Sequence, residues 1–292
     1  MRPVNRYNHN FIKHHPLQTV NVKNARVPAI GYGTWQVKDQ TATRLVEAAL
    51  DLGYRHIDTA QIYQNEAEVG KGLANAAVPR EEVFLTTKVW MTNYADGFEA
   101  SVQESLRKLG TDYVDLLLLH WPTKDLELEA YVTPLMDMQR KGYTKHIGVS
   151  NFLPEQMRRT AELGADCITN QVEYHPLLHQ REVIDTAAAL DWFITAYSPL
   201  AQGKLRDQPV LQRIAEQHDR SIWQVALRWL LQQPDTVVLP RTTSEAHLRD
   251  NFEVFDFELT ESEMRQIFAL TKQNRKLADP DFAPDWHYAP LD

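Results

Sequence analysis

The chain has 292 residues, of which 43% are hydrophobic and 24% charged, as in an ordinary globular protein. With a formal net charge of −8, no basic stripe is expected to neutralise phosphates. No apolar run approaches the ~18 residues that span a membrane. We therefore expect no nucleic-acid and no membrane partner. The single cysteine, Cys167, excludes an internal disulfide framework and fits a reducing compartment, so we expect a cytoplasmic protein.

The N-terminal stretch, residues 1–16, is polar, basic and rich in Asn and His. It lacks the apolar core of ~7–15 residues that a secretory signal contains. We expect it to be a flexible extension whose three histidines bind no metal, followed by a single domain over residues 17–292. No metal site is expected in the chain.

The first predicted elements are two short strands in residues 19–30, on either side of Lys23 and Asn24. They form a hairpin that could close one end of a barrel. Eight short apolar or β-branched runs then recur along the chain. They are residues 30–35, 54–60, 83–90, 113–121, 145–152, 167–176, 192–200 and 236–242.

Longer amphipathic stretches separate these runs and predict helices. Residues 41–53 place Leu45, Val46, Ala49 and Leu50 at helical spacing. Residues 101–110 end on a glycine suited to a helix C-terminus, and residues 210–233 predict two helices in tandem.

Eight strand–helix alternations indicate an α/β fold, a closed (β/α)8 TIM barrel of parallel strands with the helices outside. The competing fold is an open, doubly wound sheet, whose dinucleotide-binding versions contain G-x-G-x-x-G after the first strand. Here Gly31 and Gly33 are followed by Gln36 at the third glycine position. The sequence therefore favours the barrel.

Polar residues end run after run, although such residues are costly on buried parallel strands. They are Asp58, Lys88, His120, Ser150, Asn151, Gln171, Tyr197 and Ser198. In an eight-fold barrel the C-terminal ends of the strands converge on one rim, where the active sites of such barrels lie. The pattern predicts a site at this rim.

Three of these positions, together with Tyr63 five residues after Asp58, suggest chemistry at a carbonyl group. Tyr63 could donate a proton if a nearby ammonium lowered its pKa from ~10 toward neutral pH. Lys88 could supply that charge, Asp58 could orient Lys88, and His120 could polarise a carbonyl oxygen. No H-E-x-x-H, C-x-x-C or G-x-S-x-G motif is present. Because no side chain supplies hydride, an organic cofactor must do so.

The same rim offers residues suited to such a cofactor. Tyr197 could stack on a nicotinamide ring, and Ser150, Asn151 and Gln171 could hold its carboxamide. Arg241, at the end of the last strand, could bind a phosphate.

Three ordered segments resemble the signatures of the aldo-keto reductases: residues 53–70, 136–152 and 239–251 (GYRHIDTAQIYQNEAEVG, MDMQRKGYTKHIGVSNF and LPRTTSEAHLRDN). The resemblance runs from about Leu17 to the C-terminus. It implies a (β/α)8 barrel that binds NADPH in an extended conformation. It also implies NADPH-dependent reduction of small aldehydes and ketones, and nothing in the sequence demands more than a monomer.

Carried over by position, the resemblance implies that Tyr63 is the general acid, tuned by Asp58 and Lys88, with His120 orienting the carbonyl. It implies a cofactor site made of Gly33, Thr34, Trp35, Asp58, Ser150, Asn151, Gln171, Tyr197, Ser198, Pro199, Leu200, Pro240, Arg241, Thr242, Thr243, His247, Asp250 and Asn251. The substrate pocket would be lined by Trp35, Trp90, His120, Trp121 and Trp286.

The loops narrow the expected substrates, and two positions depart from the pattern. The segments after His120 and at the C-terminus are short, similar to microbial 2,5-diketo-D-gluconate reductases, which also reduce small ketoaldehydes. Arg241 replaces the usual lysine and keeps its charge. His247 replaces the usual arginine and removes a permanent charge near the cofactor's 2′-phosphate.

The main alternative is an NADP(H)-binding regulatory subunit on the same barrel, in which turnover is incidental. A protein that only binds the cofactor has no need for a proton donor. The complete set of Asp58, Tyr63, Lys88 and His120 therefore favours the enzyme.

Overall fold

The structure, a computed structural model, describes residues 18–286. The expected flexible extension over residues 1–16 lies outside this part of the chain. Two antiparallel strands open the described chain, β1 (Thr19–Val22) and β2 (Ala25–Pro28), joined at Lys23 in a left-handed conformation (φ 52°). This confirms the predicted hairpin.

Each of the eight predicted runs forms a strand of one parallel sheet in which every strand lies beside the next in sequence. The strands are β3 (Tyr32–Gly33), β4 (His56–Asp58), β5 (Phe84–Val89), β6 (Val114–Leu119), β7 (Thr144–Ser150), β8 (Cys167–Glu173), β9 (Phe193–Tyr197) and β10 (Thr236–Leu239). Bridges from Ile30 to Val238 and from Gly33 to Arg241 join the first strand to the last. The sheet is a closed barrel, as expected.

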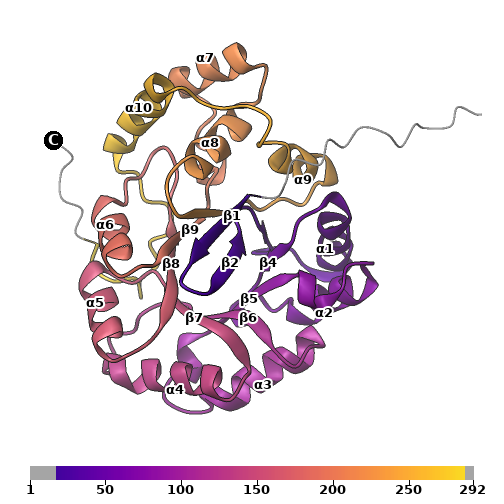
Figure 1. Cartoon of the computed structure of the whole chain (residues 1–292), viewed down its shortest axis with the longest axis vertical. Helices are drawn as coiled ribbons and strands as arrows, with labels where there is room; N and C mark the ends of the chain where they lie inside the picture. The colour runs from indigo at the N-terminus through magenta and orange to yellow at the C-terminus, as the bar shows by residue number, and fades with distance from the viewer. Residues whose placement is uncertain (1–17, 287–292) are drawn as a thin grey trace, which may run out of the picture.

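Helices connect the strands and cover the outside of the barrel (Figure 1). They are α1 (Asp39–Leu52), α2 (Glu66–Asn75), α3 (Phe98–Leu109), α4 (Leu128–Arg140), α5 (Pro154–Glu162), α6 (Arg181–Ala189), α7 (Pro209–His218), α8 (Ile222–Leu231), α9 (Glu245–Phe252) and α10 (Glu261–Leu270). The helices α1 and α3 end at Gly53 and Gly110, and both glycines have a left-handed backbone conformation. The two helices predicted in tandem are α7 and α8. Among residues 18–286, no helix is long and apolar enough to cross a membrane.

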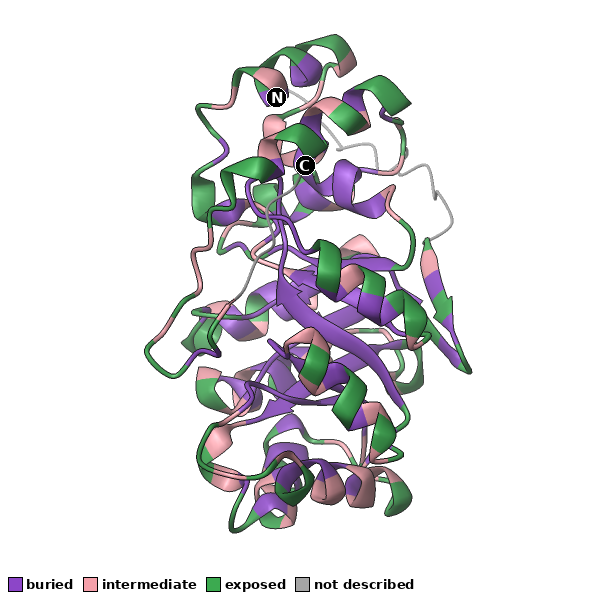
Figure 2. Cartoon of the chain, turned by 90° about the vertical axis from the view of Figure 1, so that its left-hand side faces the viewer, coloured by how far each residue is buried: buried purple, intermediate pink, exposed green. Residues whose placement is uncertain are grey.

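Burial follows the layers of the barrel. The strands of the barrel are almost entirely buried, whereas most of the helices bury one face and expose the other (Figure 2). The β1–β2 hairpin crosses the N-terminal end of the barrel (Figure 1), where the Lys23 ammonium donates to the Cys167 carbonyl at the start of β8. With this end covered, the opposite rim remains for a site.

The barrel interior also holds a buried histidine, His56, which lies two residues before Asp58 on β4 and is 1% exposed. Its Nε2 lies 3.1 Å from Thr86 Oγ1. Burial lowers the pKa of His56 to about 4. An unfolded histidine takes up its proton near pH 6.5, so acid favours the unfolded state.

We therefore expect the free energy of unfolding to fall between pH 6.5 and pH 4, by about 3 kcal/mol from His56 alone. Urea unfolding of wild type and His56→Gln across this range checks the expectation. The variant should show a shallower pH dependence than wild type. Equal slopes for wild type and His56→Gln would contradict it.

Candidate active site

The barrel brings the predicted polar residues to one rim. Asp58, Ser150 and Tyr197 are the last residues of β4, β7 and β9, Lys88 lies one residue before the end of β5, and Gln171 lies two residues before the end of β8. His120 follows β6 directly. Tyr63 ends the 3-10 turn η1 (Gln61–Tyr63), five residues after Asp58. The side chain of Gln61 fixes this turn by accepting hydrogen bonds from the backbone N–H of Trp90 and from Asn93.

Lys88 lies at the centre of the cluster, with a side chain that is fully buried. Its Nζ donates to Asp58 Oδ1 at 2.5 Å, to the Thr59 carbonyl at 2.8 Å and to the Tyr63 hydroxyl oxygen at 3.4 Å. These three acceptors match the three N–H donors of an ammonium group. Because Tyr63 accepts from Lys88, its own hydroxyl hydrogen can point elsewhere in the site.

The pKa of Tyr63 differs from the sequence expectation. We expected Lys88 to lower it toward neutral pH, but burial, and then the Asp58 carboxylate, raise the pKa of Tyr63 well above its ordinary value. The sequence-based expectation neglected desolvation and the charge on Asp58. The phenol is consequently protonated at neutral pH, which is the state that a proton donor requires.

His120 faces this cluster. Its ring lies edge-on to Tyr63, with the ring centroids 5.6 Å apart. Burial, and then the Lys88 cation, lower the pKa of His120 well below its ordinary value, so the imidazole is neutral at neutral pH. Its Nδ1 is buried and has no hydrogen-bond partner among residues 18–286. A neutral imidazole has one N–H donor, which suits a hydrogen bond to a carbonyl oxygen.

The residues predicted to hold a carboxamide form one connected network at the ends of β7, β8 and β9. Asn151 donates to Ser150 Oγ and to the His120 carbonyl, and accepts from the Tyr197 hydroxyl at 2.8 Å. Gln171 donates to Asp58 Oδ2 at 2.9 Å. The network combines amide and hydroxyl groups beside the half-buried ring of Tyr197, the donors and acceptors that a nicotinamide needs. These residues fit the proposed cofactor.

The predicted phosphate residues lie beyond β10 and on α9. Arg241 is exposed and donates through Nε and Nη2 to the carbonyls of Trp35 and Gln36. Two of its five N–H donors are thus used, and the others can reach a phosphate. His247 lies exposed in the first turn of α9, where its backbone N–H donates to Ser244 Oγ.

The remaining predicted cofactor residues lie along the same side of the rim. Gly33 pairs with Arg241, and the Thr34 hydroxyl donates to the Asp58 carbonyl. The others occupy the loop after β9, the turn after β10 and the last part of α9: Ser198, Pro199, Leu200, Pro240, Thr242, Thr243, Asp250 and Asn251. Among them Thr242 and Asn251 are buried, whereas Thr243 and Asp250 are exposed.

Aromatic rings line the other side of the site. Trp90 lies edge-on to His120 at 5.3 Å, and Trp121 lies 6.3 Å from Trp286. Phe282, which the sequence interpretation missed, lies 5.5 Å from Trp90 and 5.4 Å from Trp121 and joins them into one wall. Trp35, also predicted for this pocket, is 43% exposed and contributes its carbonyl to Arg241.

Only its place in an aromatic-rich C-terminal segment could have indicated Phe282 from the sequence. The contact joins residues about 160–190 positions apart in the chain, and no periodic pattern reports it.

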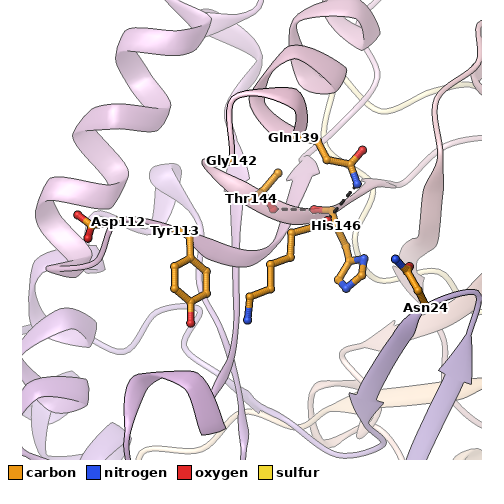
Figure 3. Close-up of a pocket in the computed structure, with 8 residues that line it drawn as sticks. Asn24, Asp112, Tyr113, Gln139, Gly142, Thr144 and His146 are labelled. Carbon is orange, nitrogen blue, oxygen red and sulfur yellow. Dashed lines mark hydrogen bonds between the residues drawn. The ribbon is translucent and has the colours of Figure 1, made fainter.

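A separate depression of about 650 Å³ lies at the opposite, N-terminal end of the barrel (Figure 3). It is lined by Asn24 of the hairpin turn and by Thr144 and His146 of β7, among others. Lys145, which also lines it, is paired with Asp115 at 2.9 Å. Because none of the rim residues lines it, this depression is separate from the candidate site.

The chain belongs to the aldo-keto reductases, because the Aldo/keto reductase family model matches residues 29–272. Together with the reductases among its relatives, this identifies the protein as an oxidoreductase that acts on carbonyl groups. Members of this family generally use NAD(P)H.

Individual relatives match over nearly their whole length. The chain is 41% identical over 265 residues to methylglyoxal reductase DkgB of Salmonella typhi, covering 89% of this chain and 99% of the relative. It is 40% identical to the 9,11-endoperoxide prostaglandin H2 reductase of Trypanosoma cruzi, covering 88% and 93%. A crystal structure provisionally assigned to 2,5-diketo-D-gluconic acid reductase B superposes with a TM-score of 0.90 at 46% identity, covering 93% and 98%.

Proposed function

We propose that this protein reduces small aldehydes and ketones to alcohols with NADPH, using Tyr63 as the general acid. The arrangement around Lys88 supports the proposal most strongly. Lys88 donates to the Tyr63 oxygen and is itself held by Asp58 and the Thr59 carbonyl. A protein that only bound the cofactor would have no use for a buried ammonium against a phenol.

The mechanism follows from these contacts. A carbonyl oxygen beside Tyr63 and His120 accepts one hydrogen bond from the phenol and one from the neutral imidazole, and both bonds polarise the carbonyl. NADPH, when bound, supplies the hydride that the carbonyl carbon receives. As charge develops on the oxygen, Tyr63 transfers its proton, and its oxygen becomes negative next to Lys88. The ammonium thus stabilises the phenolate as it forms, although the resting phenol has a raised pKa.

Ser150, Asn151 and Gln171 would hold the nicotinamide carboxamide, with Tyr197 against the ring. On the opposite side, Trp90, Trp121 and Phe282 shield the reacting group from water. Excluding water strengthens the two hydrogen bonds to the carbonyl oxygen, because charges interact more strongly at low dielectric.

The relatives suggest the substrate class. One is a methylglyoxal reductase, and one structure is provisionally assigned to a 2,5-diketo-D-gluconic acid reductase. We propose ketoaldehydes and diketo sugar acids as substrates. A panel of methylglyoxal, phenylglyoxal and 2,5-diketo-D-gluconate, followed by NADPH absorbance, tests the proposal. Consumption of NADPH with at least one of them supports it. NADPH binding without consumption across the panel would instead support a regulatory, cofactor-binding role.

Arg241 and His247 should set the preference for NADPH over NADH. Unit charges ~4 Å apart interact by roughly 1 kcal/mol in water and ~4 kcal/mol near a protein surface. We therefore expect Arg241→Gln to weaken NADPH binding by about tenfold and NADH binding much less. His247→Arg at pH 8 should strengthen NADPH binding selectively.

Fluorescence titration of wild type and of each variant with NADPH and NADH gives two dissociation constants per protein, and their ratio measures the cofactor preference. Arg249→Gln, on the same helix as His247, is the matched control and should leave the ratio unchanged. If Arg241→Gln and wild type had the same ratio of NADH to NADPH dissociation constants, the Arg241 guanidinium would not bind the 2′-phosphate.

A further inference from the structure

A buried carboxylate, Glu173, ends strand β8 and belongs to none of the groups described above. Its side chain is completely buried, and it lies two residues after Gln171, on the same face of the strand. A buried carboxylate is costly unless several donors satisfy it. The contacts of Glu173 therefore show what the fold uses it for.

Three of its four donors come from the C-terminal segment. Glu173 Oε1 accepts from the backbone N–H of Leu277 at 2.8 Å, and Oε2 accepts from that of Ala278 at 2.9 Å. The ammonium of Lys276 lies 3.2 Å from Oε2. His175, also fully buried, completes the set at 2.9 Å from Oε1.

Burial opposes the charge on Glu173, but His175, Lys276 and the Ala278 N–H outweigh it. The pKa of Glu173 consequently lies below its ordinary value, and the group is ionised at neutral pH.

The anchored residues lead directly to the aromatic wall. We name residues 276–286 the tail loop. Its two ends meet, because the Lys276 ammonium lies 4.0 Å from the centroid of the Trp286 ring. Between them, Phe282 lies against Trp90 and Trp121, and Trp90 in turn lies against His120. A connected path thus runs from the Glu173 carboxylate to the ring beside the carbonyl-binding histidine.

We propose that Glu173 is a positioning residue for the substrate pocket: its buried carboxylate fixes the tail loop and so places Phe282 against the substrate. The proposal rests on the proposed reductase function. Because a flat apolar group on the carbonyl would contact Phe282 most, the effect of Glu173 is larger for aryl-substituted ketoaldehydes than for methylglyoxal.

Glu173→Gln replaces one carboxylate oxygen, an acceptor, by an NH2 group, a donor. This NH2 group must face donors that the oxygen had bound, so that buried polar groups are left without an acceptor. We expect backbone amides of the tail loop to exchange hydrogen about tenfold faster in this variant. The KM for phenylglyoxal should rise about tenfold, with kcat and the NADPH dissociation constant within about twofold of wild type. The KM for methylglyoxal should rise less.

Two further variants separate positioning from general damage. Glu263→Gln removes another buried carboxylate, bonded to Thr260 at the start of α10 and to His218 at the end of α7, and should leave tail-loop exchange and both KM values unchanged. Phe282→Ala should raise the KM for phenylglyoxal by itself, and adding Glu173→Gln should raise it little further, because both changes remove the same contact.

If Glu173→Gln does not fold, Lys276→Met tests the same anchor. It keeps both backbone hydrogen bonds and should give a smaller increase in exchange and in KM. The proposal would be overturned if the tail-loop amides of Glu173→Gln exchanged hydrogen at the wild-type rate. The same result in Lys276→Met would overturn it if Glu173→Gln does not fold. An equal KM increase for both ketoaldehydes would also overturn it. Hydrogen exchange needs no turnover, so an inactive wild type would refute the reductase function while the anchor remained measurable.

Discussion

Tyr63→Phe should lower kcat by about 10²–10⁴-fold, the range typical of general acid catalysis. The variant keeps the aromatic ring and loses only the hydroxyl group that accepts from Lys88 at 3.4 Å. NADPH binding should be retained, because Tyr63 is not among the predicted cofactor residues, which lie on or after β3, β4, β7, β8, β9 and β10 and on α9. Steady-state kinetics and a fluorescence titration with NADPH measure the two quantities.

Tyr54→Phe is the matched control for the loss of a tyrosine hydroxyl. That hydroxyl is buried and donates to the Leu248 carbonyl, away from the rim cluster. The Tyr54→Phe substitution should lower the free energy of unfolding without changing kcat. A Tyr63→Phe variant with near-normal kcat would remove Tyr63 from the mechanism.

Lys88→Met should abolish reduction and also destabilise the fold. Lys88 and Asp58 have side chains that are 0% and 4% exposed, and removing one partner of a buried pair leaves the other charge uncompensated. We expect a loss of about 3–5 kcal/mol in the free energy of unfolding. Urea unfolding and NADPH consumption measure the two effects.

The double variant Asp58→Asn, Lys88→Met separates these effects, because it removes both charges. Its stability should recover toward wild type, whereas its activity should not. Activity that returned together with stability would show that Lys88 acts through folding alone, and the proposed stabilisation of the Tyr63 phenolate would be wrong.

The barrel and the position of its site could be predicted from the sequence because both are indicated by patterns among neighbouring residues. Strand runs and helical stretches alternate at short range, and a polar residue at the end of a buried run must point to a rim. Asp58, Lys88 and Gln171 are therefore placed together by topology, and the structure joins them through Asp58.

The remaining features depend on contacts between distant residues or on burial. Glu173 and Lys276 are 103 positions apart, and Phe282 contacts Trp90 from a segment that lies far from it in the sequence. The direction of the Tyr63 pKa depends on how far folding desolvates the phenol, which residue types alone do not report. The residues that lie at the rim could thus be predicted from the sequence, whereas the environment of Tyr63 and the path of the tail loop could not.

Transfer of isotope from cofactor to product tests the central proposal most directly. The protein would be mixed with methylglyoxal and NADPH that carries deuterium at C4 of the nicotinamide, in separate reactions for the two C4 epimers. Mass spectrometry of the alcohol should find one deuterium on the carbinol carbon with one epimer only, formed at a rate that falls about 10²–10⁴-fold in Tyr63→Phe. Tight binding of NADPH with no deuterium in the alcohol, or equal rates in wild type and Tyr63→Phe, would contradict it.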